Sequence, residues 1–197
     1  MRQTVPVCAS PPLRVEAPPP PAPACDLDVG WLERAERIHA RSLASGHAGL
    51  SESHADLARD GEAYRGLAGV TYRRRPGAPV VGEARELQLS YAELHGFLVG
   101  VRDALAIRPT PPPERGHVYV SDTSATVEIA VDIQVPGHAV TLEVDDAQDD
   151  PAPWRVRGCS GPLPYEAQKA MTATWRGLAR RLGFESLRDA AQQRAAP

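Results

Sequence analysis

The chain has few cysteines and no recognisable catalytic signature. It contains three cysteines in 197 residues, Cys8, Cys25 and Cys159, an odd number at wide spacing. This pattern excludes a disulfide framework and a zinc site built from closely paired cysteines. The GxSxG, HExxH, Walker and GxGxxG motifs are also missing. We therefore expect a reducing, cytoplasmic location, with no cofactor and no metal.

The sequence also lacks a long apolar run. No stretch approaches the roughly 18 apolar residues that a membrane span requires, so no membrane association is expected. Prolines interrupt the N-terminus from residue 6 onward, which argues against a cleaved signal peptide. Eight of the 20 prolines lie in residues 1–25, which predicts a disordered leader. Its role as a spacer, a docking segment or a targeting signal stays open.

Basic residues are missing from one region in particular. Residues 117–150 contain eight carboxylates and no Lys or Arg, whereas residues 165–197 contain six basic and three acidic residues. The two regions either face each other or water, or they form a polarised surface that steers a charged partner.

The acidic region shows the clearest structural pattern in the chain. Apolar residues alternate with polar ones through 126–135 and again through 139–145, with Pro136-Gly137 between them. Successive strand side chains point to opposite faces, so this pattern predicts a hairpin with one apolar and one acidic face. Further strands are expected at about 117–122 and 154–157, completing an antiparallel meander.

Helical spacing is found on both sides of this meander. Ser90 and Glu93 form a capping box before a stripe over about 91–107, and a second apolar stripe covers about 165–182. Similar spacing predicts an N-terminal helical pair within 28–66, with helices at about 29–45 and 54–66.

We therefore predict an α+β fold, an antiparallel sheet at about 117–157 packed by the two long amphipathic helices. The expected organisation is a leader at 1–25, a single domain at 26–190 with its core at 70–183, and a frayed C-terminus at 191–197.

Two surfaces are candidates for binding. One is the acidic side of the hairpin, which carries Glu128, Asp132, Glu143 and Asp145. The other is the basic C-terminal helix, which carries Arg176, Arg180 and Arg181. An ordinary solvated face is the competing interpretation of both.

These features favour a non-enzymatic protein-interaction module, such as an adaptor, a regulator or a chaperone-like protein that could form a homodimer. The element order is broadly similar to that of small acidic α+β dimers that chaperone secreted proteins, which is a likeness of fold alone. One alternative is a small hydrolase or transferase that uses Cys159 with a histidine. Another is a nucleic-acid-associated protein, binding through Arg73–Arg75 and the C-terminal arginines, or a DNA mimic that uses the acidic face.

Overall fold

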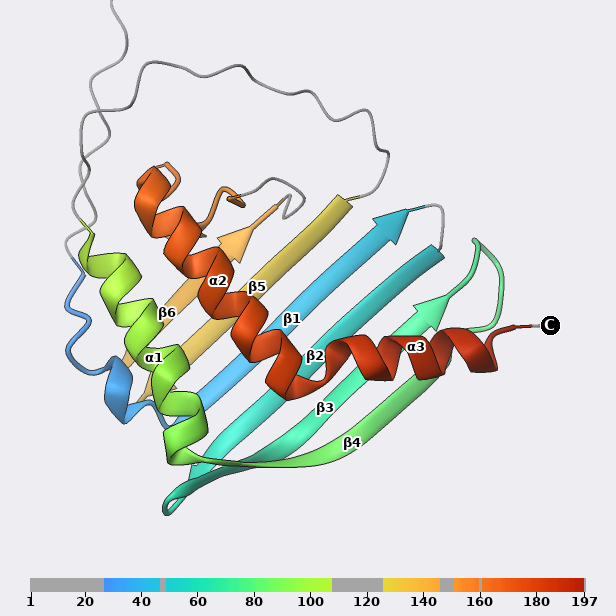
Figure 1. Ribbon diagram of the computed structural model, residues 1–197, viewed down its shortest axis with the longest axis horizontal. Coiled ribbons are helices and arrows are strands. Elements are labelled where there is room, and N and C mark those ends of the chain that lie inside the picture. Colours follow the sequence, from blue (N-terminus) through green and yellow to red (C-terminus); the bar gives the residue numbers. More distant parts are fainter. Residues whose placement is uncertain (1–26, 47–48, 108–125, 146–150, 160, 197) are drawn as a thin grey trace, which may run out of the picture.

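The protein has an α+β architecture built on one antiparallel sheet (Figure 1). The computed structural model describes residues 27–46, 49–107, 126–145, 151–159 and 161–196. The leader at 1–25 and the strand expected at 117–122 lie outside the described residues. Seven strands follow one another across the sheet in the order β4-β3-β2-β1-β5-β6-β7.

Four of these strands form an N-terminal meander of sequential neighbours. They are β1 (Arg37–Gly46), β2 (Gly49–Asp60), β3 (Ala63–Arg73) and β4 (Val81–Ser90). The chain then continues through α1 (Tyr91–Ala106), β5 (Thr126–Val135), β6 (His138–Val144), β7 (Arg155–Val156), α2 (Tyr165–Leu182) and α3 (Phe184–Arg194). Strand β5 pairs with β1, so the two halves of the chain join in the middle of the sheet.

The N-terminal helical pair predicted over 28–66 is wrong, because these residues form β1, β2 and the start of β3. Among the described residues of that region, the helical structure is limited to a three-residue 3-10 helix, η1 (Leu32–Arg34). In β1 the side chains of Ile38, Ala40 and Ser42 are buried, which is the alternation of a strand. The predicted frayed C-terminus begins too early, since α3 continues to Arg194.

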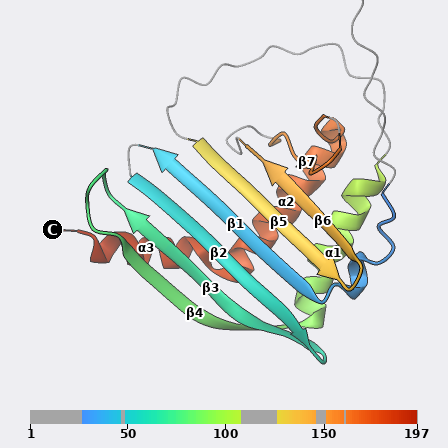
Figure 2. The ribbon, with the colours of Figure 1, turned by 180° about the vertical axis from the view of Figure 1, so that it is seen from behind.

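All three α-helices cover the same face of the sheet, and the view from behind shows the other face without a helix across it (Figure 2). The apolar positions of the strands point toward the helices and form one core cluster with them. That core contains Leu98 from α1, Trp175 from α2 and Val131 from β5. None of the described helices combines the length and the apolarity needed to cross a membrane.

The capping box predicted at the start of α1 is confirmed. Glu93 N–H donates to the Ser90 hydroxyl at 3.3 Å, and the Glu93 carboxylate accepts from Ser90 N–H at 2.7 Å. The backbone N–H and the hydroxyl of Ser90 both donate to the Glu93 carboxylate, and these hydrogen bonds lower the pKa of Glu93. The helix therefore begins at a fixed residue directly after the edge strand β4.

Replacing Ser90 with Ala should lower the free energy of unfolding by about 1 kcal/mol, because one orphan N–H of the first turn loses its acceptor. Urea denaturation at neutral pH measures this loss. The control is Ser186→Ala, because the Ser186 hydroxyl donates to the carbonyl of Gly183 and caps no N–H. Equal stability of Ser90→Ala and the wild type would contradict the cap's contribution.

Candidate binding surface

Figure 2 looks onto the helix-free side of the sheet, which we call the open face. The burial pattern of β5 and β6 places the acidic side chains predicted on the hairpin on this side. In β5 and β6 the alternate positions are buried under the helices, so Glu128, Asp132 and Glu143 point the other way. Asp145 follows β6 and is exposed. The sequence prediction that these four carboxylates share a face agrees with the strand register.

Strand pairing brings arginines from distant parts of the chain to these carboxylates. Ala130 in β5 lies between Arg41 of β1 and Glu143 of β6, and Glu143 in turn pairs with Arg155 of β7. One row across the open face is therefore Arg41, Ala130, Glu143 and Arg155. Cross-strand neighbours of opposite charge stabilise such a row.

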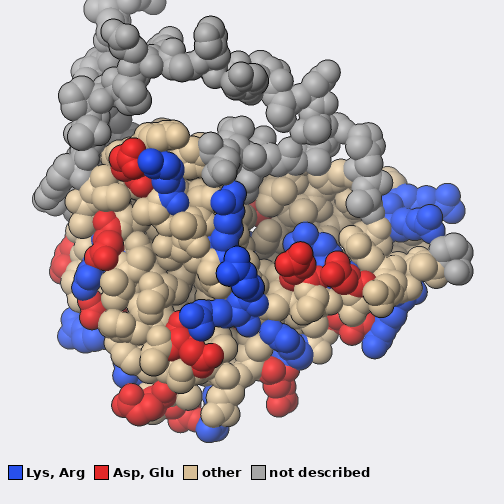
Figure 3. Space-filling view, in the orientation of Figure 1, with Lys and Arg blue, Asp and Glu red and all other residues tan. Residues whose placement is uncertain are grey.

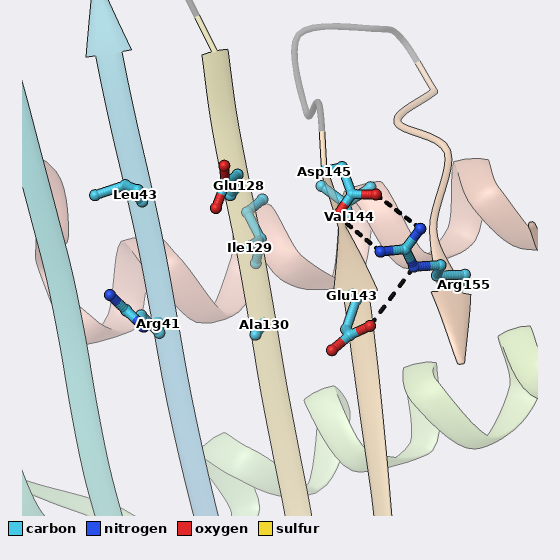
Figure 4. Close-up of a pocket in the computed structure, with 9 residues that line it drawn as sticks. All are labelled: Arg41, Leu43, Glu128, Ile129, Ala130, Glu143, Val144, Asp145 and Arg155. Atoms are coloured by element: carbon cyan, nitrogen blue, oxygen red, sulfur yellow. Dashed lines mark hydrogen bonds and ion pairs between the residues drawn. The ribbon is translucent and has the colours of Figure 1, made fainter. Parts of the chain in front are cut away.

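Arg155 binds two of the carboxylates in this region (Figure 4). Its guanidinium lies 2.7 Å from Asp145 Oδ2 and 3.5 Å from Glu143 Oε2. Arg157 also donates to Glu143 Oε1, with its Nε at 2.6 Å. Glu143, whose side chain is 18% exposed, is thus held between two arginines.

Glu128 differs from its neighbours because its carboxylate is exposed and forms no ion pair or hydrogen bond with any described residue. It stands beside a hollow of about 150 Å³ that Ala130, Arg41, Glu143 and Arg155 also line. Arg41 is engaged by Glu52, with Nε 2.9 Å from Oε1. The hollow is therefore lined by Ala130 and by the Glu128 carboxylate, which has no partner among the described residues. Its two arginines, Arg41 and Arg155, are already paired with other carboxylates.

Asp132 lies farther along the same face and has an internal partner. Its Oδ1 accepts a hydrogen bond from the Thr141 hydroxyl at 2.6 Å. A second, wider hollow of about 750 Å³ occupies the half of the open face formed by β1 to β4. The exposed Leu67 lies in its lining, so the open face carries apolar as well as charged surface.

The basic helix predicted as the second surface lies on the opposite side of the sheet. Lys and Arg side chains gather in a column over α2 on the helix side (Figure 3). Arg176, Arg180 and Arg181 are exposed, and Arg181 Nη1 lies 3.9 Å from a carboxylate oxygen of Glu93. The acidic face and this helix therefore do not neutralise each other. On the open face, Arg155 pairs with Glu143 and Asp145, and Arg157 pairs with Glu143.

Cys159, the candidate nucleophile, follows β7 and is disulfide-bonded. A nucleophilic cysteine acts as a thiolate, so catalysis would first require reduction of this bond. Among the described residues, no group of three or more His, Cys, Asp and Glu side chains could hold a metal ion. Asp146, Asp149 and Asp150 of the acidic loop lie outside those residues.

Sequence reasoning did not assign Arg41, Arg155 or Arg157 to this surface. The alternation of Trp154, Arg155, Val156 and Arg157 does indicate that the two arginines share one side of a strand. Their position against Glu143 depends on the pairing of β6 with β7, which local periodicity does not reveal. The position of Arg41 similarly depends on the pairing of β1 with β5.

Comparison of the chain with protein-family models, with curated proteins and with solved structures gave no match.

Proposed function

We propose that this chain is a non-enzymatic protein-interaction module whose open face binds a basic segment of a protein partner. The observation that carries the proposal is the carboxylate of Glu128, which pairs with none of the described residues and stands beside the hollow that Ala130 lines. A guanidinium or ammonium group in that hollow would meet Glu128 directly, and its charge would complement the carboxylates around it.

The hollow has a suitable size for such a group. A cavity of about 150 Å³ accepts a molecule as large as benzene, which is larger than a guanidinium. The neighbouring carboxylates of Glu143 and Asp145 are already held in place by Arg155. Because these ion pairs hold the lining side chains in place, less entropy is lost on binding.

The arrangement is less suited to the two nucleic-acid alternatives. Arginines from β1 and β7 interrupt the carboxylates of the open face, whereas a DNA mimic needs a continuous array of anions. Direct nucleic-acid binding would use the basic column over α2, on the other side of the sheet (Figure 3). Variants on the two sides therefore separate these functions.

Replacing Glu128 with Arg should reduce partner binding about tenfold or more, because a basic segment would then meet a like charge. The immobilised full-length protein is used to capture partners from lysate of its native host, with quantification by mass spectrometry. Ala130→Leu is the second variant, since it fills the floor of the hollow without changing its charge and should also weaken binding.

The matched control is Arg180→Glu, a charge reversal on the exposed side of α2. It should leave capture of the same partners unchanged. Partners that survive Glu128→Arg but are lost with Arg180→Glu would instead place binding on the helix side. Capture that is identical for the wild type and for both open-face variants would contradict the proposal.

A further inference from the structure

Strand β4 forms one edge of the sheet, and no strand of the described residues pairs with its outer side (Figures 1 and 2). It is ten residues long and contains neither proline nor lysine. Short length, proline and lysine are common means of preventing edge strands from pairing with other chains. This edge carries none of them, so its backbone groups are available to another strand.

The helix-side positions of β4 carry two opposite charges between two apolar residues. Val81, Glu83, Arg85 and Leu87 alternate along this side of the strand. Charges that point inward on an edge discourage pairing with a strand that cannot match them. Only a strand that places a base against Glu83 and an acid against Arg85 fits this edge.

Among the described residues, Glu83 has one charged partner and Arg85 has none. Glu83 Oε1 lies 2.7 Å from Arg194 Nε, but that oxygen accepts no hydrogen bond from the described residues. Arg85 donates one long hydrogen bond, at 3.4 Å, to the carbonyl of Arg181, and no carboxylate of the described residues lies within ion-pair distance. Arg85 therefore retains capacity for an acidic partner, whereas Glu83 is already paired with Arg194.

A second copy of the same strand supplies this match in one antiparallel register. When a two-fold axis passes through Ala84, Glu83 of each copy lies opposite Arg85 of the other, and Val81 lies opposite Leu87. Axes through Glu83, Arg85 or Glu86 place identical charges face to face, which destabilises strand pairing. The sequence of β4 is thus self-complementary about Ala84.

We infer that the chain forms a symmetric homodimer in which the two β4 strands pair about Ala84 and join the sheets into one. An interface with a two-fold axis uses the same patch on both subunits, which is the relation that this self-complementary strand provides. The inference does not rest on the proposed function, because β4 and the hollow at Glu128 lie in different parts of the sheet.

Sedimentation equilibrium of the full-length protein and of charge-reversal variants tests this dimer. The wild type should have twice the monomer mass of 21.2 kDa. Glu83→Arg and Arg85→Glu should each be monomeric at concentrations where the wild type is dimeric, because each places like charges opposite one another at two symmetric positions. An equimolar mixture of the two variants should recover the dimeric mass, since every facing pair is then opposite in charge.

Ala84→Lys provides an independent variant at an exposed position on the axis, where it leaves the contacts of Glu83 with α3 untouched. It should weaken the dimer about tenfold or more. A monomeric wild type would overturn the inference, as would single variants that dimerise as well as the wild type. Single variants that stay monomeric when mixed would also overturn it, provided that circular dichroism shows both to be folded.

Discussion

Replacing Trp154 with Ala should lower the free energy of unfolding by about 3–5 kcal/mol, the usual cost of truncating a buried tryptophan. The Trp154 side chain is fully buried, and its ring lies 6.3 Å from the ring of Trp175. Trp175 in turn contacts Phe184 at the same centroid distance. This aromatic row connects the β7 end of the sheet to α2 and α3, so the cavity would open where three elements meet.

Trp154 also carries a polar contact that a smaller aromatic residue cannot reproduce. Its indole N–H donates to the Thr172 hydroxyl at 3.2 Å, inside the core. Trp154→Phe should therefore fall between the wild type and Trp154→Ala, because it retains much of the packing but loses the hydrogen bond.

Urea denaturation followed by far-UV circular dichroism measures both variants of Trp154. Val80→Ala is the matched control, since Val80 is 52% exposed and its truncation should change stability by less than about 0.5 kcal/mol. A loss below about 1 kcal/mol for Trp154→Ala would show that the row does not support the β7 end of the sheet.

Local patterns were sufficient to predict the central hairpin and the two long helices. The hairpin expected at 126–135 and 139–145 corresponds to β5 at Thr126–Val135 and β6 at His138–Val144. Its buried side consists of Ile, Val and Leu, which give a strong two-residue period. The helices expected at 91–107 and 165–182 occupy the ranges of α1 and α2.

Strands β1 and β2 could not be predicted in this way because most of their buried positions carry small side chains. Ala40, Ser42, Ser53 and Ala55 contribute little apolar area, so the two-residue period of β1 and β2 is weak. Trp31, Ala35, Ile38 and Ser42 also fit a helical spacing, which the sequence alone cannot distinguish from a strand. Pairing of β1 with β2 and β5 decides the outcome.

The candidate site was likewise predictable only where it depends on single strands. Alternation along single strands places Glu128 and Glu143 on one face, and that part of the expectation follows from local geometry. The ion pairs of Arg155 and the position of Ala130 depend on which strands are neighbours. Long-range strand order therefore determines which of these carboxylates has no partner among the described residues, and the structure identifies it as Glu128.

Tyr64→Phe should lower the free energy of unfolding by about 1–3 kcal/mol at neutral pH. Tyr64 lies in β3 with its ring fully buried, and its hydroxyl donates to the backbone carbonyl of Ala35. Ala35 follows η1, so this hydrogen bond attaches the segment before β1 to strand β3, next to the edge of the sheet. Without the hydroxyl, the buried carbonyl of Ala35 loses its donor, while the packing of the ring is retained.

The same substitution should change the response of stability to alkaline pH. Burial raises the pKa of Tyr64 above its ordinary value, and Tyr91 and Glu36 add to this effect while Arg59 opposes it. Because the folded state holds the phenol proton more tightly than the unfolded state, the contribution is complete below about pH 10 and is lost as the pH rises through the folded pKa. The stability difference between the wild type and Tyr64→Phe should therefore shrink above about pH 10.

Thermal or urea unfolding of both proteins between neutral pH and about pH 11 measures this convergence. Tyr165→Phe serves as the control at an exposed tyrosine, and it should leave stability at neutral pH unchanged. A constant difference between the wild type and Tyr64→Phe across this range would contradict the role assigned to the phenol proton. Equal stability of the wild type and Tyr64→Phe at neutral pH would instead show that the carbonyl of Ala35 finds another donor. A buried carbonyl without a donor would lower the free energy of unfolding.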